Sequence, residues 1–187
     1  MSMRLFVGIA LAPDVTGELT RLTARLRRND DGLRWSAAES WHVTLEFLGA
    51  AEREQYECVC ARLREIHRPP VPIRLEAPGF FDRAGIFFVG VHSSPELASL
   101  ERHVVAATTL CGFEPEMRPY HPHITLARSR GRDGDHGLRR LKDHLQTAHE
   151  FSPFTAEEFL LYESRPAPGG SHYAILARFP LRERREA

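Results

Sequence analysis

Two stretches of the sequence share a pattern of a histidine, an apolar residue, a threonine and a second apolar residue. They are His42-Val43-Thr44-Leu45 and His123-Ile124-Thr125-Leu126. Because side chains alternate between the two faces of a β-strand, His42 and Thr44 are expected on one face of the first strand. His123 and Thr125 repeat this arrangement on the second strand. Short motifs arise by chance, but two copies are expected in under about 1% of chains with this composition.

The two histidines could act together as a general acid and a general base. An unperturbed imidazole has a pKa of about 6.5, so one ring can be protonated while its partner is neutral. Each well-placed proton transfer is worth roughly 10²- to 10⁴-fold in rate. The hydroxyls of Thr44 and Thr125 can donate hydrogen bonds to an anionic group between the rings. A phosphodiester fits this description, so the pattern predicts phosphodiester cleavage by His42 and His123.

Arg128 and Phe47 occupy equivalent positions, five residues after the histidine of each motif. Strict alternation would turn both side chains toward the apolar side, which is costly for an arginine. We therefore predict that the second strand ends or bulges near Ala127, which frees Arg128 toward the histidines. Two interpretations of Phe47 stay open: a core residue, or a ring that stacks on a nucleic-acid base.

A strand, an amphipathic helix and a His-Thr strand follow one another twice along the chain. Residues 5–11 and 86–91 are apolar runs typical of buried strands. Residues 13–26 and 95–111 carry apolar side chains at helical spacing. The repetition indicates that the same kind of unit presents each motif.

This repetition predicts one domain, residues 1–187, with two similar lobes and repeat units of about residues 4–49 and 85–128. Val7 precedes His42 by 35 residues in the first unit, and Val89 precedes His123 by 34 residues in the second. An extended repeat array would need three or more copies. Two copies therefore favour a pair of lobes.

The other segments are expected to complete antiparallel sheets, because several connections are short. Gly49 should close the first His-Thr strand, and Pro78-Gly79 should form a turn or bulge. The remaining expected elements are a brief strand at 33–35, a turn at 36–40, a helix at 52–67, a strand at 73–77, a loop at 129–137, a short helix at 138–145, a strand at 159–163, a loop at 164–170 and a strand at 172–181.

Charge and cysteine content narrow the class of protein. Lysine plus arginine and aspartate plus glutamate balance at 25 each, which argues against non-specific coating of nucleic acid but leaves room for a local basic groove. Three cysteines, with no C-x-x-C spacing, suggest neither a disulfide framework nor a zinc site.

The apolar run before Pro13 is too short for a signal peptide or membrane span. We expect a monomeric cytoplasmic protein with no membrane attachment.

The two H-x-T-x strands resemble those of the two-histidine (2H) phosphoesterase superfamily. Residues 41–49, Trp-His-Val-Thr-Leu-Glu-Phe-Leu-Gly, are similar to the bacterial RNA 2′,3′-cyclic phosphodiesterase branch, also called the 2′-5′ RNA ligase family. The resemblance continues in residues 4–7 as an opening strand, in residues 122–128 as the second motif, and in residues 161–165 with Tyr173 as a closing hairpin.

The resemblance implies an α+β, bilobal 2H phosphoesterase fold with two pseudo-symmetric antiparallel sheets, flanked by helices, around a central groove. It implies metal-independent opening of a terminal RNA 2′,3′-cyclic phosphate to a 2′-phosphate without a cofactor, and in reverse a 2′-5′ ligation of RNA ends. His123 would be the base that activates water, and His42 the acid that protonates the departing 3′ oxygen. Thr44, Thr125 and Arg128 would hold the phosphate oxygens.

Several residues near the motifs have less specific expectations. By alternation Glu46 shares the face of His42, and it either orients a groove residue or lies exposed at the strand end. His121 is expected at the groove rim or in a structural role, with metal ligation as the alternative. Tyr162 and Tyr173 are expected to pack in the core.

Four functions remain in competition at this point. The first is a hydrolase for RNA or nucleotide 2′,3′-cyclic phosphates, and the second is a 2H esterase for another small cyclic or linear phosphodiester. The third is a non-catalytic RNA-binding module on the same scaffold. The fourth is a metal-dependent hydrolase that uses His42, His121 and His123. Both histidines and both threonines are present, which favours an active enzyme over a binding module.

Overall fold

The structure is a computed structural model that describes residues 2–145, 149–168 and 170–183, with the side chains of residues 132–134 outside the description. Its elements, in chain order, are β1 (Met3–Ala10), α1 (Pro13–Leu26), β2 (Leu33–Trp35), a 3-10 turn (Ala38–Ser40), β3 (His42–Ala51), α2 (Arg53–Arg64), β4 (Val71–Ile73), β5 (Leu75–Phe81), a 3-10 turn (Asp82–Ala84), β6 (Ile86–Val91), α3 (Pro95–Thr109), β7 (His123–Ser129), α4 (Gly131–His144), β8 (Phe154–Ala156), β9 (Glu158–Ala167) and β10 (Gly170–Pro180).

The two helices of the sequence repeat form where the pattern predicts them. Pro13 occupies the first position of α1, where its missing N–H removes no hydrogen bond, and Val15, Leu19 and Leu22 are buried. In α3 the hydroxyl of Ser94 accepts a 3.1 Å hydrogen bond from the N–H of residue 97 and caps the helix. Both helices therefore begin at a proline after an extended residue.

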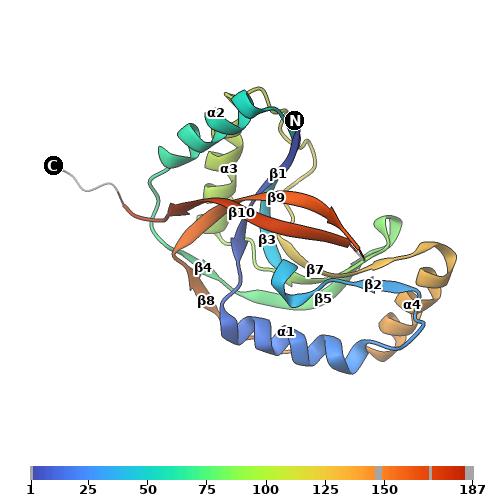
Figure 1. Cartoon of the computed structure of the whole chain (residues 1–187). Helices are drawn as coiled ribbons and strands as arrows, with labels where there is room; N and C mark the ends of the chain where they lie inside the picture. The colour runs from blue at the N-terminus through green and yellow to red at the C-terminus, as the bar shows by residue number, and fades with distance from the viewer. Residues whose placement is uncertain (1, 146–148, 169, 184–187) are drawn as a thin grey trace.

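The strands form two antiparallel four-stranded sheets and one separate pair within the described residues (Figure 1). The first sheet has the order β10-β9-β1-β3 and carries the first motif on β3. The second sheet has the order β2-β7-β6-β5 and carries the second motif on β7. Strand β4 pairs with β8. The expected α+β fold with two antiparallel sheets is confirmed.

Strands are exchanged between the two halves of the chain. Strand β2, which precedes the first motif, pairs with β7 in the second sheet. The C-terminal strands β9 and β10 join the first sheet through the pairing of β9 with β1. Each sheet thus contains strands from both halves of the sequence.

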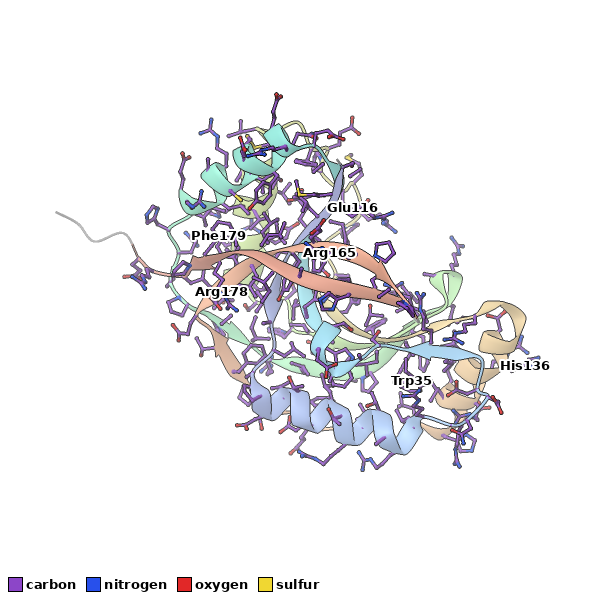
Figure 2. All side chains as sticks on the ribbon, in the orientation of Figure 1. Trp35, Glu116, His136, Arg165, Arg178 and Phe179 are labelled. Atoms are coloured by element: carbon purple, nitrogen blue, oxygen red, sulfur yellow. A yellow bond between two sulfur atoms is a disulfide. The ribbon has the colours of Figure 1, made fainter. Side chains whose placement is uncertain are left out.

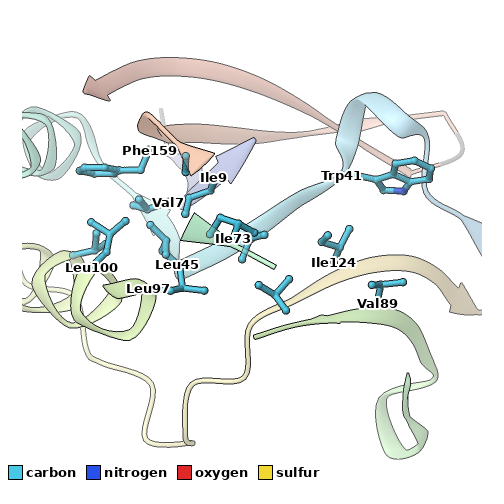
Figure 3. Packing of buried hydrophobic residues seen from close by; sticks show 14 of the residues in the cluster. Val7, Ile9, Trp41, Leu45, Ile73, Val89, Leu97, Leu100, Ile124 and Phe159 are labelled. Carbon is cyan, nitrogen blue, oxygen red and sulfur yellow. The ribbon is translucent and has the colours of Figure 1, made fainter. Parts of the chain in front are cut away.

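One buried hydrophobic cluster connects the sheets and holds the two motifs in place (Figure 3). Val7 and Leu45 from the first sheet belong to it, together with Val89 and Ile124 from the second. Each of these side chains is at most 3% exposed. The apolar positions of both motifs therefore face a common core and turn the histidines away from it.

The predicted loop at 129–137 is wrong, because α4 begins at Gly131. Gly137 explains how a glycine-rich segment remains helical: a β-carbon there would lie 2.1 Å from the carbonyl oxygen of Asp31. The glycine lets the helix approach the chain before β2, and Leu138 and Leu141 are buried beside it. Tertiary packing therefore outweighs the low helix propensity of glycine.

The predicted loop at 164–170 is also wrong, since β9 runs to Ala167 and β10 starts at Gly170, with residue 169 outside the described part. Pro166 is tolerated in β9 because β1 pairs only with residues 160–163 of that strand. Figure 2 shows Arg165 on this hairpin, where its Nε donates a 2.7 Å hydrogen bond to Glu163.

Three smaller boundaries also differ from prediction. Gly49 does not end the first motif strand, which continues to Ala51; Gly49 has φ +75 at an irregularity in the pairing with β1. The single strand expected at 73–77 is divided into β4 and β5, which belong to different sheets. Pro78 and Gly79 lie inside β5 and pair with consecutive residues of β6. The register shift lies between Leu75 and Pro78, so the bulge precedes the predicted position.

Cys58 and Cys111 form a disulfide between α2 and the end of α3, with a Cα–Cα distance of 5.8 Å. The expectation of no disulfide is therefore wrong, and Cys60 is left as a buried free thiol. The pairing was not readable because the partners are 53 residues apart in sequence and meet only when the two helices pack. Among the described residues no helix has the length and apolar character needed to span a membrane.

Candidate active site

A groove of about 880 Å³ brings together side chains of both motifs. His42 and Thr44 line it from β3, and His123 and Thr125 line it from β7. Its volume lies in the usual range of small-molecule sites, about 300–1,000 Å³. The two motifs, far apart in sequence, therefore share one cavity.

An unpaired residue follows the threonine in each motif and changes the alternation of side chains. Leu45 of β3 has no partner on β1, because Thr44 and Glu46 pair with consecutive residues of that strand. Leu126 of β7 likewise has no partner on β6. Such a bulge re-aims the side chains that follow it. The carbonyl of Leu126 accepts a 2.8 Å hydrogen bond from the backbone N–H of Ser36, which stabilises the second bulge.

Arg128 reaches the groove because of the second bulge, as the sequence predicts for this charged side chain. Burial lowers the pKa of Arg128 from its ordinary value, and the charge of Arg34 on the neighbouring strand lowers it further. The charge of Arg128 in turn lowers the pKa of both motif histidines. The guanidinium of Arg128 therefore contributes positive charge to the groove that holds both rings.

Phe47, the equivalent residue after the first bulge, is 68% exposed and lines the groove. The interpretation of Phe47 as a core residue is therefore wrong. Its ring centroid lies 5.9 Å from that of Phe6, and its outer face is open to solvent. The open face is suited to stacking on a flat group such as a nucleobase.

Hydrogen bonds orient the ring of His42. Its Nδ1 lies 2.8 Å from the carbonyl oxygen of Ser40, and because a carbonyl can only accept, Nδ1 carries the hydrogen. Its Nε2 lies 3.0 Å from Oγ1 of Thr44. In the neutral ring Nε2 is therefore the acceptor, and it is the nitrogen on the threonine side.

His123 is held in the same way. Its Nδ1 donates a 2.7 Å hydrogen bond to the carbonyl oxygen of His121, again two residues earlier in the chain. The same tautomer therefore leaves Nε2 of each motif histidine as the proton-accepting atom. His121 itself lies at the rim of the groove with an exposed side chain, as expected.

Burial lowers the pKa of His42 to about 4, and the charges of His123 and Arg128 act in the same direction. Burial also lowers the pKa of His123, with contributions from the charges of His121 and Arg128. In both rings the hydrogen bond to a backbone carbonyl opposes the shift. Both imidazoles of the free protein are therefore neutral at neutral pH.

Aromatic rings surround both histidines. The ring of Tyr173 meets that of His42 edge-on at 5.2 Å, and the ring of Phe81 meets that of His123 edge-on at 4.9 Å. Tyr173 lines the groove and also packs against the buried cluster of Phe6, Leu160 and Tyr162, so the expected core packing of both tyrosines is confirmed. Phe81 was missed because nothing in its local sequence marks it.

The expectation that Glu46 lies exposed at the strand end is wrong, and the side chain lines the groove together with His42. That it orients a groove residue stays a prediction. The first bulge turns it toward α3, where its side chain is only 6% exposed. The hydroxyl of Thr108 donates a 2.7 Å hydrogen bond to Oε2 of Glu46. Burial raises the pKa of Glu46 to about 6, the bond from Thr108 opposes this, and the charge of Glu101 raises it further.

Tyr120, which the sequence interpretation did not single out, ties the approach to the second motif to the first. Its hydroxyl donates a 2.9 Å hydrogen bond to the carbonyl oxygen of Thr44. The side chain also lines the groove. Within the described residues, no group of three or more histidine, cysteine, aspartate or glutamate side chains is placed to hold a metal ion.

Comparison with known proteins identifies relatives along most of the chain. A family model described as the 2′-5′ RNA ligase superfamily matches residues 12–166. The RNA 2′,3′-cyclic phosphodiesterase of Methanocaldococcus jannaschii is 24% identical over 179 residues, which cover 93% of this chain and 98% of that protein. The protein of the same name from Escherichia coli is 28% identical over 182 residues, which cover 95% and 96% of the two chains.

Solved structures show the same architecture. A crystal structure described as a phosphoesterase superposes with a TM-score of 0.82 at 26% identity and covers 98% of this chain and 100% of its own. Escherichia coli LigT in apo form gives a TM-score of 0.80 at 25% identity, over 97% of this chain and 99% of its own. The same LigT has been solved in complex with 3′-AMP.

Proposed function

Because this chain belongs to the 2′-5′ RNA ligase superfamily, we propose that it hydrolyses terminal RNA 2′,3′-cyclic phosphodiesters to 2′-phosphomonoesters. One observation carries the proposal: two imidazoles with matching tautomers face one groove beside Arg128. Relatives over more than nine-tenths of the chain are named RNA 2′,3′-cyclic phosphodiesterases, which supports this choice of substrate.

In the proposed reaction His123 is the general base. Its Nε2 removes a proton from a water molecule, whose oxygen attacks the phosphorus of the cyclic phosphate. The bond from phosphorus to the 3′ oxygen breaks, and His42 as the general acid gives that oxygen a proton. The product carries a 2′-phosphate and a free 3′-hydroxyl. The bonds from Nδ1 to the carbonyls of Ser40 and His121 keep both Nε2 atoms available for these transfers.

Thr44, Thr125 and Arg128 would bind the non-bridging oxygens of the phosphate. Charge builds on these oxygens as water attacks, and charge-assisted donors that are already in place stabilise it. Phe47 would stack on a base of the same substrate. The chain's own side chains would therefore supply both proton transfers and the stabilisation of the transition state without a metal ion.

The low pKa of His42 fits the role of acid only when substrate is bound. A phosphodiester brings a negative charge into the groove, and a nearby opposite charge favours the protonated imidazole. Binding would therefore raise the pKa of His42, so that its ring becomes protonated and can act as the acid. Since His123 must be neutral at the same time, the pH dependence of turnover should be bell-shaped.

The same chemistry extends to the joining of RNA ends. If an RNA 5′-hydroxyl takes the place of water, attack on the cyclic phosphate forms a 2′-5′ linkage and releases the 3′-hydroxyl. We propose this ligation as a secondary activity. We also propose that residues 1–187 act as one two-lobed domain, monomeric and cytoplasmic, with repeat units of about 4–49 and 85–128. Support for a monomer is that both histidine strands of the groove come from one chain.

The test is turnover of an oligonucleotide with a 2′,3′-cyclic phosphate end in excess chelator, with 2′- and 3′-phosphate products resolved. His42→Ala and His123→Ala should each lower the rate by at least about 10²-fold, the usual effect of losing an acid or base. His103→Ala is a matched control, because His103 is exposed on α3 and bonds its own helix. Loss of activity in chelator would support the metal-dependent alternative, and binding without turnover would support an RNA-binding module.

A further inference from the structure

The groove extends from the motif histidines to an acidic chamber against α3. Glu46, Glu101, Val105 and Tyr120 line this part. Burial raises the pKa of Glu101 and that of Glu46, and the charge of Glu101 raises the pKa of Glu46 further. This end of the groove thus has the opposite charge character to the phosphate end at Arg128.

Glu46 borders this chamber and has one carboxylate oxygen without a donor in the described part of the chain. Its Oε2 accepts the bond from Thr108, but its Oε1 is buried and has no partner among the described residues. The side chain is 6% exposed and borders the groove. Leaving a carboxylate oxygen buried without a donor is costly. Although its pKa is raised to about 6, the carboxyl is ionised in most molecules at neutral pH and can only accept.

The ligand group that fits this chamber must bring hydrogen-bond donors. Arg118 does not supply them, because at the rim of the groove it is paired with Glu116. In an RNA end whose phosphate lies at the histidines, a ribose hydroxyl offers one donor, whereas a base can offer two side by side. Guanine alone among the four RNA bases offers two adjacent donors, N1–H and the 2-amino group, on its Watson–Crick edge. On that edge uracil, cytosine and adenine each place an acceptor beside the donor, which a carboxylate would repel.

We propose that Glu46 reads guanine by accepting hydrogen bonds from N1–H and the 2-amino group, which makes guanosine 2′,3′-cyclic phosphate ends the preferred substrates. Oε1 accepts one of these bonds, and the lone pair of Oε2 that Thr108 leaves unused accepts the other. Phe47, the next residue and an exposed ring on the groove, provides a stacking face. The inference rests on the proposed function, since it identifies which base that function selects.

The test compares kcat/KM for the 2′,3′-cyclic phosphates of guanosine, inosine and uridine. Inosine differs from guanosine only by lacking the 2-amino group, so it isolates one bond to the carboxylate. Guanosine should be preferred over inosine by at least about 10-fold, the usual effect of a hydrogen bond to a charged group. Glu46→Gln should bring this ratio close to one. Thr108→Val removes the bond to Oε2 but leaves the carboxylate, so the ratio should stay well above one.

The outcomes separate the two proposals. Turnover of all three nucleotides at equal kcat/KM would overturn base reading while leaving the hydrolase intact. If none of them is hydrolysed, the proposed function fails, and base reading is then decided by the binding of guanosine and inosine 2′-phosphates, for which the same ratio is expected. Equal losses for every base in Glu46→Gln and Thr108→Val would mean that Glu46 acts only as a structural partner of α3, and would overturn the inference. Glu57→Gln, an exposed position on α2, is the matched control.

Discussion

The hydroxyl of Tyr120 donates a 2.9 Å hydrogen bond to the carbonyl oxygen of Thr44, so the segment that leads into one histidine strand is fastened to the other. The bond is a direct side-chain link between the approach to the second motif and the strand of the first motif. It joins residues 76 positions apart in the chain. The relative placement of the two threonine hydroxyls should therefore depend on it.

Tyr120→Phe should lower both stability and turnover. Loss of the bond leaves a half-buried carbonyl without its donor, which should reduce the free energy of unfolding by about 1–3 kcal/mol in chemical denaturation. A small displacement of Thr44 should lower kcat by up to about 10-fold. Tyr56→Phe on α2 is the matched tyrosine away from the groove. An unchanged kcat in Tyr120→Phe would show that the link does not position Thr44.

Arg128→Gln should shift the pH dependence of kcat/KM to higher pH. The charge of Arg128 lowers the pKa of both His42 and His123, so its removal raises both values and moves both limbs of the bell upward. In the wild type both limbs should lie below pH of about 6.5, the ordinary histidine value, because both pKa values are lowered. The maximal rate should also fall, since a donor to the phosphate is lost. A lower rate with unshifted limbs would contradict the electrostatic coupling.

Gly137→Ala should destabilise the protein, whereas Gly17→Ala should stabilise it. A β-carbon at Gly137 would lie 2.1 Å from the backbone oxygen of Asp31, which cannot move without displacing the chain before β2. We expect a loss of at least about 2 kcal/mol in the free energy of unfolding. At Gly17 in α1 a β-carbon would lie 3.7 Å from the tip of the Arg21 side chain, so the usual helix gain of about 0.5–1 kcal/mol applies. Equal effects in thermal denaturation would contradict the close packing of α4.

Cys58→Ser should lower the melting temperature only under oxidising conditions. Its bond to Cys111 closes a loop of 53 residues, for which the chain-entropy relation gives a stabilisation of about 4 kcal/mol. A reductant should lower the melting temperature of the wild type to that of the variant, and it should leave the melting temperature of the variant unchanged. In a reducing cytoplasm the thiols would be free. Alkylation of three thiols in oxidised, unfolded wild-type protein would refute the disulfide.

The sequence was most informative where a pattern is local. The helix at 13–26 and the strand at 86–91 matched because their apolar spacing determines their buried face. The motif strands were predicted from the alternation of side chains between the two faces of a strand. The approach of Arg128 to the histidines was predicted from the cost of burying a guanidinium. That cost required a bulge, and Leu126 provides it.

Other features depend on contacts between distant segments. Glu46 and Phe47 were placed by strict alternation, but the unpaired Leu45 exchanges their faces, and no apolar residue announces a bulge. The helical form of residues 131–137 depends on a close approach to Asp31 that sequence patterns do not reveal. Tyr120 was missed because its partner is a backbone carbonyl, which any residue could offer.

The exchange of β2 into the second sheet sets a limit on how far the groove can open. Ser36, just after β2, is bonded to Leu126 of one motif strand, and the other motif begins at His42. Six residues span at most about 20 Å when fully extended. The connection therefore sets an upper limit on the separation of the two histidine-bearing strands. Substrates should be selected in part by whether they fit within that limit.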